Sequence, residues 1–274
     1  MEILVDWWSD SLLVYHRLHM PIPAQLPTTH HDGQGPNLLY HVEGELVPVL
    51  RLHLGGSVPA YFEHHVLLWK EPSIDIRLKP IKGAFKRFIA GMPIFMTQAV
   101  GQGHIAFSRD GPGQIIPMHL QPGQSIEVRE HQFLAASDNI AFTFTRVRGI
   151  ANMLFGSTGF FIDRFTAEQY EGVVFLHGYG NVYEVNLGPN EVIDVEPGGW
   201  LYKDAGVRMD IKVMGLRSGI FAGSGQLVFN RFSGPGRLGL QSMYVHTGDS
   251  GNAGVGNAAA AGGVAAAVIK GLTR

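Results

Sequence analysis

Apolar and polar residues alternate in three separate stretches of the chain, and each alternation follows an apolar pair and a polar turn. The stretches are LLWKEPSIDIRL (67–78), FLAASDNIAFTF (133–144) and WLYKDAGVRMDI (200–211). In the first stretch Ile74, Ile76 and Leu78 stand at every second position, so they share one face of a strand. The pattern predicts strands with one buried and one solvated face, and no long stretch between them has the 3.6-residue period of a helix.

These stretches belong to a longer repeat. GQIIPMHLQPGQSIEV (113–128) and GNVYEVNLGPNEVIDV (180–195) stand 67 positions apart and share glycine, leucine, proline, isoleucine and valine positions, and VPVLRLHLGGSVPAYF (47–62) is a weaker third copy. FIAGMPIFMTQA (88–99), LFGSTGFFIDRF (154–165) and FAGSGQLVFNRF (221–232) form a further repeated block, which indicates a glycine loop followed by a strand.

The repeat predicts an all-β fold of three tandem units, at about 46–112, 113–179 and 180–247. Each unit is a small antiparallel module with a face that it cannot bury alone, so we expect the three to pack around a pseudo-threefold axis as a β-prism. Residues 1–45 are expected to add a strand or two to this core. Residues 248–274 are rich in glycine and alanine and are expected to form a short helix or flexible tail rather than a membrane anchor.

The glycine loop LFGSTGFFIDRF, the segment VVFLHGYGNVYEVNLGPNE and the segment FAGSGQLVFNRFSGPG resemble bacterial members of the altered-inheritance-of-mitochondria family. The resemblance covers about residues 46–245. It implies a fold like that of the tryptophan RNA-binding attenuation protein (TRAP), with three short double-stranded β-helix-like units fused in one chain. It implies no catalytic residues, because the family defines none, and it suggests RNA or small-ligand binding only by analogy of fold.

Composition narrows the classes of function. Of 274 residues 45% are hydrophobic and 16% charged, which indicates a folded chain, and 36 glycines with 15 prolines indicate many turns. The net charge of −2 gives no bulk attraction to nucleic acid, so a nucleic-acid partner is disfavoured. Without cysteine there is no disulfide and no thiolate nucleophile. Acidic Glu2 and Asp6 stand where a secretion signal carries basic residues, so a cytoplasmic location is expected.

Each repeat carries cations beside large apolar residues in the same glycine-flanked position. The candidate interaction residues are Lys82, Lys86, Arg87 and Phe88 in the first unit, Arg148, Leu154 and Phe155 in the second, and Arg217, Ile220 and Phe221 in the third. A threefold arrangement would gather them at one end, where an apolar cluster ringed by cations suits a partner protein or an anionic membrane surface. In the alternative interpretation the apolar residues cap the core and only the cations are solvated.

Thirteen histidines raise the alternative of a metal-dependent enzyme, but the neighbours His64 and His65 point to opposite faces of a strand and cannot share an ion. The pairs Glu63-His64 and Glu130-His131 are equivalent in the repeat and form a candidate carboxylate–imidazole cluster near the axis; solvated turn residues are the alternative. The chain has no Gly-x-Ser-x-Gly motif of a serine nucleophile. The nearest Gly-Ser strings lie in the repeated glycine loops, and their repetition indicates turns. We therefore expect a non-enzymatic scaffold or binding protein without cofactor, which docks on a partner protein, a membrane surface or another copy of itself.

Overall fold

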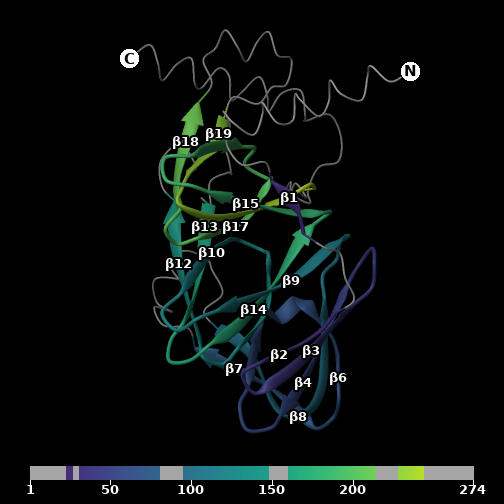
Figure 1. The fold of residues 1–274 in the computed structure, drawn as a ribbon. Coiled ribbons are helices and arrows are strands. Elements are labelled where there is room, and N and C mark those ends of the chain that lie inside the picture. Colours follow the sequence, from purple (N-terminus) through teal and green to yellow (C-terminus); the bar gives the residue numbers. More distant parts are fainter. Residues whose placement is uncertain (1–22, 27–30, 81–94, 148–159, 214–227, 244–274) are drawn as a thin grey trace, which may run out of the picture.

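The computed structural model describes residues 23–26, 31–80, 95–147, 160–213 and 228–243 (Figure 1). These residues form twenty strands and one short 3₁₀ turn, which confirms the all-β prediction. In this part of the chain no helix has the length and apolar character needed to cross a membrane.

In the first segment of the core all the other strands pair with one long strand, β8 (Phe95–Ser108). The segment also contains β4 (Val49–Gly55), β5 (Ala60–Phe62), the 3₁₀ turn η1 (His64–Val66), β6 (Leu67–Lys70) and β7 (Ile74–Pro80). The first half of β8 pairs with β5 and β7, and its second half pairs with β4 and β6. Gly101 and Gly103 stand at this change of partners with φ of 131° and 139°, and a Cβ at Gly101 would collide with the carbonyl oxygen of Ser73.

The strands of the middle segment pair in the same pattern as those of the first segment. Its members are β9 (Gly113–Leu120), β10 (Ser125–Arg129), β11 (Phe133–Ser137), β12 (Ile140–Val147), β13 (Phe160–Ala167) and β14 (Gly172–Tyr179). β14 lies between β9 and β11, and β13 lies between β10 and β12, all antiparallel.

The last segment has the same set of neighbours. Its members are β15 (Val182–Leu187), β16 (Val192–Val195), β17 (Trp200–Asp204), β18 (Arg208–Val213), β19 (Val228–Ser233) and β20 (Gly236–Gln241). β20 lies between β15 and β17, and β19 lies between β16 and β18.

Two strand pairs join the three segments. β5 of the first segment pairs with β11 of the second, and β10 of the second pairs with β17 of the third. Three strands from the first 45 residues add to this core: β1 (Ala24–Gln25) pairs with β15, and β2 (His31–Gly35) pairs with β3 (Leu38–Glu43), which pairs with β4.

Burial follows the alternation through the third stretch, where Met209 and Ile211 pack against the core, but only at the start of the first stretch. Ile74, Ile140 and Val207 are buried, whereas Ile76 and Leu78 are 38% and 66% exposed. The prediction that Ile74, Ile76 and Leu78 share one buried face is therefore wrong for the last two. In the described part of the chain β7 pairs only with β8. As an edge strand it has a neighbour on one side only, so fewer residues cover the side chains of Ile76 and Leu78.

Candidate functional site

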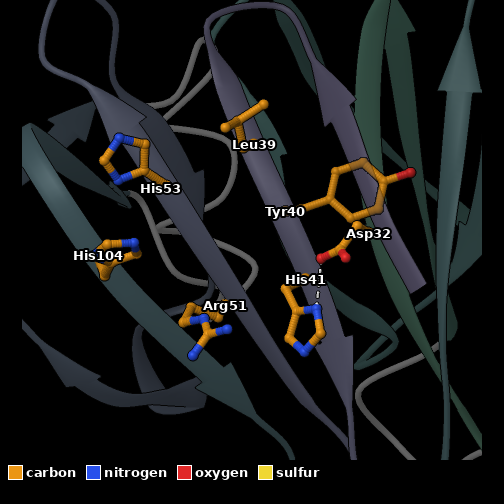
Figure 2. A pocket seen from close by; sticks show the side chains of 7 residues that line it. All are labelled: Asp32, Leu39, Tyr40, His41, Arg51, His53 and His104. Carbon is orange, nitrogen blue, oxygen red and sulfur yellow. Dashed lines mark hydrogen bonds and ion pairs between the residues drawn. The ribbon is translucent and has the colours of Figure 1, made fainter. Parts of the chain in front are cut away.

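A shallow hollow of about 280 Å³ lies over strands β2, β3, β4 and β8 (Figure 2). Its lining residues are Asp32, Leu39, Tyr40, His41, Arg51, His53 and His104. The register of the sheet brings them together, because His41 lies opposite Arg51, and His53 lies opposite both Leu39 and His104. Sequence analysis did not identify this hollow, since its residues come from four strands whose alignment the sequence alone does not specify.

Carboxylates already contact two of the imidazoles in the hollow. His41 Nδ1 lies 2.6 Å from Asp32 Oδ1 and its Nε2 lies 3.3 Å from Glu43 Oε2. The hydrogen bond to His104, at 2.7 Å, lowers the pKa of Glu71. Among the described residues no group of three or more histidines and carboxylates could hold a metal ion. The hollow therefore offers a mixed-charge surface for contact with a polar ligand and gives no support to the metal-dependent alternative.

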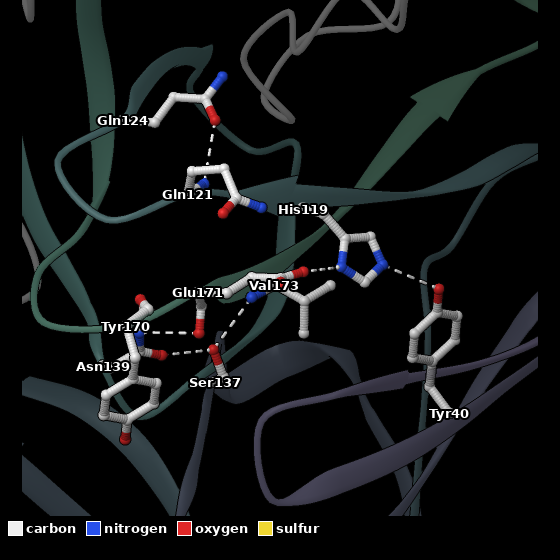
Figure 3. A network of polar contacts seen from close by, with 9 residues as sticks. All are labelled: Tyr40, His119, Gln121, Gln124, Ser137, Asn139, Tyr170, Glu171 and Val173. Atoms are coloured by element: carbon white, nitrogen blue, oxygen red, sulfur yellow. Dashed lines mark hydrogen bonds and ion pairs between the residues drawn. The ribbon is translucent and has the colours of Figure 1, made fainter.

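A second polar network links the added strand β3 to β9 and the start of β14 (Figure 3). The Tyr40 hydroxyl lies 3.2 Å from His119 Nε2, and His119 Nδ1 lies 2.9 Å from a Glu171 carboxylate oxygen. Nearby, Asn139 donates to the carbonyl oxygens of Tyr170 and Glu171. These contacts satisfy turn and strand-end groups, so we assign the network a structural role.

The candidate carboxylate–imidazole cluster lies around a buried arginine. Arg109 donates from Nη2 to Glu63 Oε2 at 2.5 Å and to the Phe133 carbonyl at 2.8 Å. His131 Nε2 lies 3.0 Å from Glu130 Oε1. That hydrogen bond raises the pKa of His131 against its burial, with the charge of Glu63 in support and that of Arg109 in opposition.

Glu63 and Glu130 therefore both lie within electrostatic reach of His131, and His64 begins the turn η1. Sequence analysis missed Arg109, although a half-buried carboxylate such as Glu63 calls for a cationic neighbour.

His177 lies in the same neighbourhood on β14 and is fully buried. Its ring meets that of Tyr179 edge to face, with centroids 4.9 Å apart. Burial, with the charge of Arg109 adding to it, lowers the pKa of His177 to about 4. The imidazole is therefore neutral near pH 7 and acts as part of the core.

A three-member charge ladder marks the junction between the second and third segments. Glu127 on β10 contacts Arg164 of β13 and Lys203 of β17, each at 2.5 Å. The Lys203 side chain is only 5% exposed and also donates to the Val207 carbonyl at 2.6 Å. Burial opposes ionisation of Glu127, but the hydrogen bonds from Lys203 and Arg164 outweigh it and lower its pKa. On β16, Asp194 accepts two hydrogen bonds of 2.6 Å from Arg231 of β19.

The predicted interaction loops lie outside the described residues. This applies to all ten candidates: Lys82, Lys86, Arg87, Phe88, Arg148, Leu154, Phe155, Arg217, Ile220 and Phe221. Their segments connect β7 to β8, β12 to β13 and β18 to β19.

Comparisons with known proteins identify a family and a fold. A family model described as mitochondrial biogenesis AIM24 matches residues 40–243. Among solved structures, the crystal structure of protein SPYM3_0169 from Streptococcus pyogenes is similar, with a TM-score of 0.60 and 19% sequence identity over 76% of this chain and 94% of that one. At this identity the similarity is one of fold. A comparison with curated proteins finds no match.

Proposed function

Because the chain belongs to the mitochondrial biogenesis AIM24 family and its three segments have the same strand pairings, we propose that it is a non-enzymatic scaffold built from three TRAP-like units. It docks on a partner protein or an anionic membrane surface through the three basic and apolar loops. In this proposal the repeat supplies three similar contacts from one chain, which together bind more tightly than one contact does.

The pairing pattern supports the three-unit interpretation. In the second and third segments the first and third strands pair with the sixth, and the second and fourth strands pair with the fifth. In the first segment the long strand β8 replaces both the fifth and the sixth strand. The register of the third strand also shifts at the same place in each segment, between Leu67 and Trp69, between Phe133 and Ala135, and between Trp200 and Tyr202. Such a shift is typical of a β-bulge, and three at equivalent positions favour three copies of one unit.

The described residues do not show the closed threefold prism that the repeat predicts. Closure requires β16 of the third unit to pair with β6 of the first, as β5 pairs with β11 and β10 with β17. In the described part of the chain β16 pairs only with β19, and β6 only with β8. We therefore propose three units in series.

The observation that carries the docking proposal is that the three loops join equivalent strands. Each connects the two strands of an equivalent hairpin, and the pairing continues to the residues that flank the loop. The flanking pairs are Pro80 with Phe95, Val147 with Phe160, and Val213 with Val228. Each loop therefore starts and ends at the last pair of its hairpin, and segments that connect strands are the parts of a fold that most often carry binding residues.

We expect the triple variant Phe88→Ser, Phe155→Ser, Phe221→Ser to lose binding to vesicles that contain phosphatidylserine, because each substitution removes an apolar group that would enter the lipid interface. Flotation of the full chain with such vesicles measures this. Leu46→Ser is the matched control, since Leu46 is 72% exposed in a turn outside the three loops. Equal flotation of the wild type and a folded triple variant would contradict the proposal.

A further inference from the structure

The strand pairs that join the units stop at two edges. Within the chain, the second strand of one unit pairs with the third strand of the next, twice in succession. The second strand of the last unit is β16 and the third strand of the first unit is β6, and in the described residues neither has a partner from another unit. Figure 1 shows β6 near one end of the molecule and β19, the neighbour of β16, near the other.

The strand β6 is more exposed than its equivalent strands in the other two units. Every residue of its equivalent β11 is buried, and in β17 all but Asp204 are buried. In β6, by contrast, Leu68 and Trp69 are 55% and 44% exposed and Lys70 is exposed as well. Exposed apolar side chains next to an unpaired strand edge are a template for addition of another strand.

The charges at the two edges complement each other. Asp194 stands 67 positions after Glu127, and Arg231 stands 67 positions after Arg164, so the Asp194–Arg231 contact repeats two members of the charge ladder. The third member of that ladder is Lys203, whose repeat equivalent in the first unit is Lys70. The Lys70 ammonium donates only a long hydrogen bond, 3.4 Å, to the Glu71 carbonyl in the described structure.

We propose that β16 of one copy pairs antiparallel with β6 of a second copy of this chain. The register follows from the internal junction, in which Val128 lies opposite Tyr202 and Glu127 opposite Lys203. The same spacing sets Val195 opposite Trp69 and Asp194 opposite Lys70. A valine then faces an aromatic residue and an acid faces a lysine, as in the internal junction, and the second copy completes the charge ladder.

The two edges differ, so the contact is head to tail and repeats into a closed ring or an open filament. This inference rests on the three-unit organisation proposed above, but it uses different residues from the docking loops.

Cysteine cross-linking tests the register directly, because the wild type has no cysteine. We expect a mixture of the Trp69→Cys and Val195→Cys chains to form a disulfide-linked pair on oxidation, since opposite residues on paired strands have neighbouring Cβ atoms. Each variant alone is expected to stay uncross-linked. A mixture of Arg77→Cys with Val195→Cys is the control, because Arg77 is exposed on β7 outside the proposed contact. Equal cross-linking in the control mixture, or none in the test mixture, would overturn the proposal.

Light scattering tests the assembly itself. The full-length wild type is expected to have a mass several times the 29.9 kDa of one chain, and Lys70→Glu is expected to reduce it to that of one chain. Lys70→Arg and Arg77→Glu are expected to keep the assembly. A wild type of one-chain mass at every concentration, with β6 covered by its own chain or left bare, would overturn the proposal. Vesicle flotation of Lys70→Glu separates this result from the docking proposal, since that variant keeps Phe88, Phe155 and Phe221.

Discussion

Replacing Glu127 with glutamine is expected to lower the free energy of unfolding by about 3 kcal/mol, because it leaves the buried Lys203 ammonium without its counter-charge. The amide keeps the shape of the side chain, so the loss reports charge rather than packing. Denaturant unfolding near pH 7 measures it.

Asp194→Asn is the matched control for this prediction, with both substitutions measured in the Lys70→Glu background so that Asp194 has no partner from a second copy. Asp194 occupies the equivalent position, but its side chain is 35% exposed and its partner Arg231 is 37% exposed. Solvent screening limits such a pair to about 1 kcal/mol or less. Equal losses in the two variants would contradict the role of Glu127 at the junction.

The ladder also has a defined pH dependence. The folded pKa of Glu127 is lowered from 4.5, so its contribution to stability is present above that pH and is lost as the pH falls below it. The Glu127→Gln variant is expected to lack this part of the acid sensitivity.

His177 is expected to lower the free energy of unfolding as the pH falls from 6.5 to 4. Its pKa is about 4 in the folded protein against 6.5 for the free side chain, so between these values the unfolded chain binds the proton and the folded chain does not. The free energy of unfolding should therefore fall by about 3 kcal/mol from this residue as the pH decreases from 6.5 to 4.

Denaturant unfolding at a series of pH values tests this, with His177→Leu as the variant that cannot take up the proton. His131→Gln is the comparison, because the pKa of His131 is raised and its contribution has the opposite sign. If His177→Leu kept the pH slope of the wild type between pH 6.5 and 4, the neutral buried imidazole would be contradicted.

The all-β fold could be predicted from sequence because period-two alternation and a repeat of 66 to 67 residues are properties of the chain itself. The exposure of Ile76 and Leu78 could not be predicted, since alternation says which residues share a face but not whether another element covers that face. Ile74 is buried and Leu78 is exposed on the same strand for this reason.

The same limit applies to the candidate sites: the repeat indicates equivalent residues, but contacts that depend on strand register cannot be predicted from it. The repeat singles out Glu63-His64 and Glu130-His131 as equivalent pairs, whereas Arg109, which contacts Glu63, has no repeat signature. His41, His53 and His104 meet only through the register of three strands. The ladder from Glu127 to Lys203 likewise depends on which strand lies beside β10, and that pairing between units is not written in local sequence.

The central claim is that one strand pairing joins units within the chain and also joins successive chains. Amide hydrogen exchange of the full-length protein, which compares β6 with its equivalents β11 and β17, tests it most directly. We expect all three strands to be protected in the assembled wild type, and only β6 to lose protection in Lys70→Glu. A β6 that exchanges rapidly in the assembled wild type, or that stays as protected in Lys70→Glu, would contradict the claim.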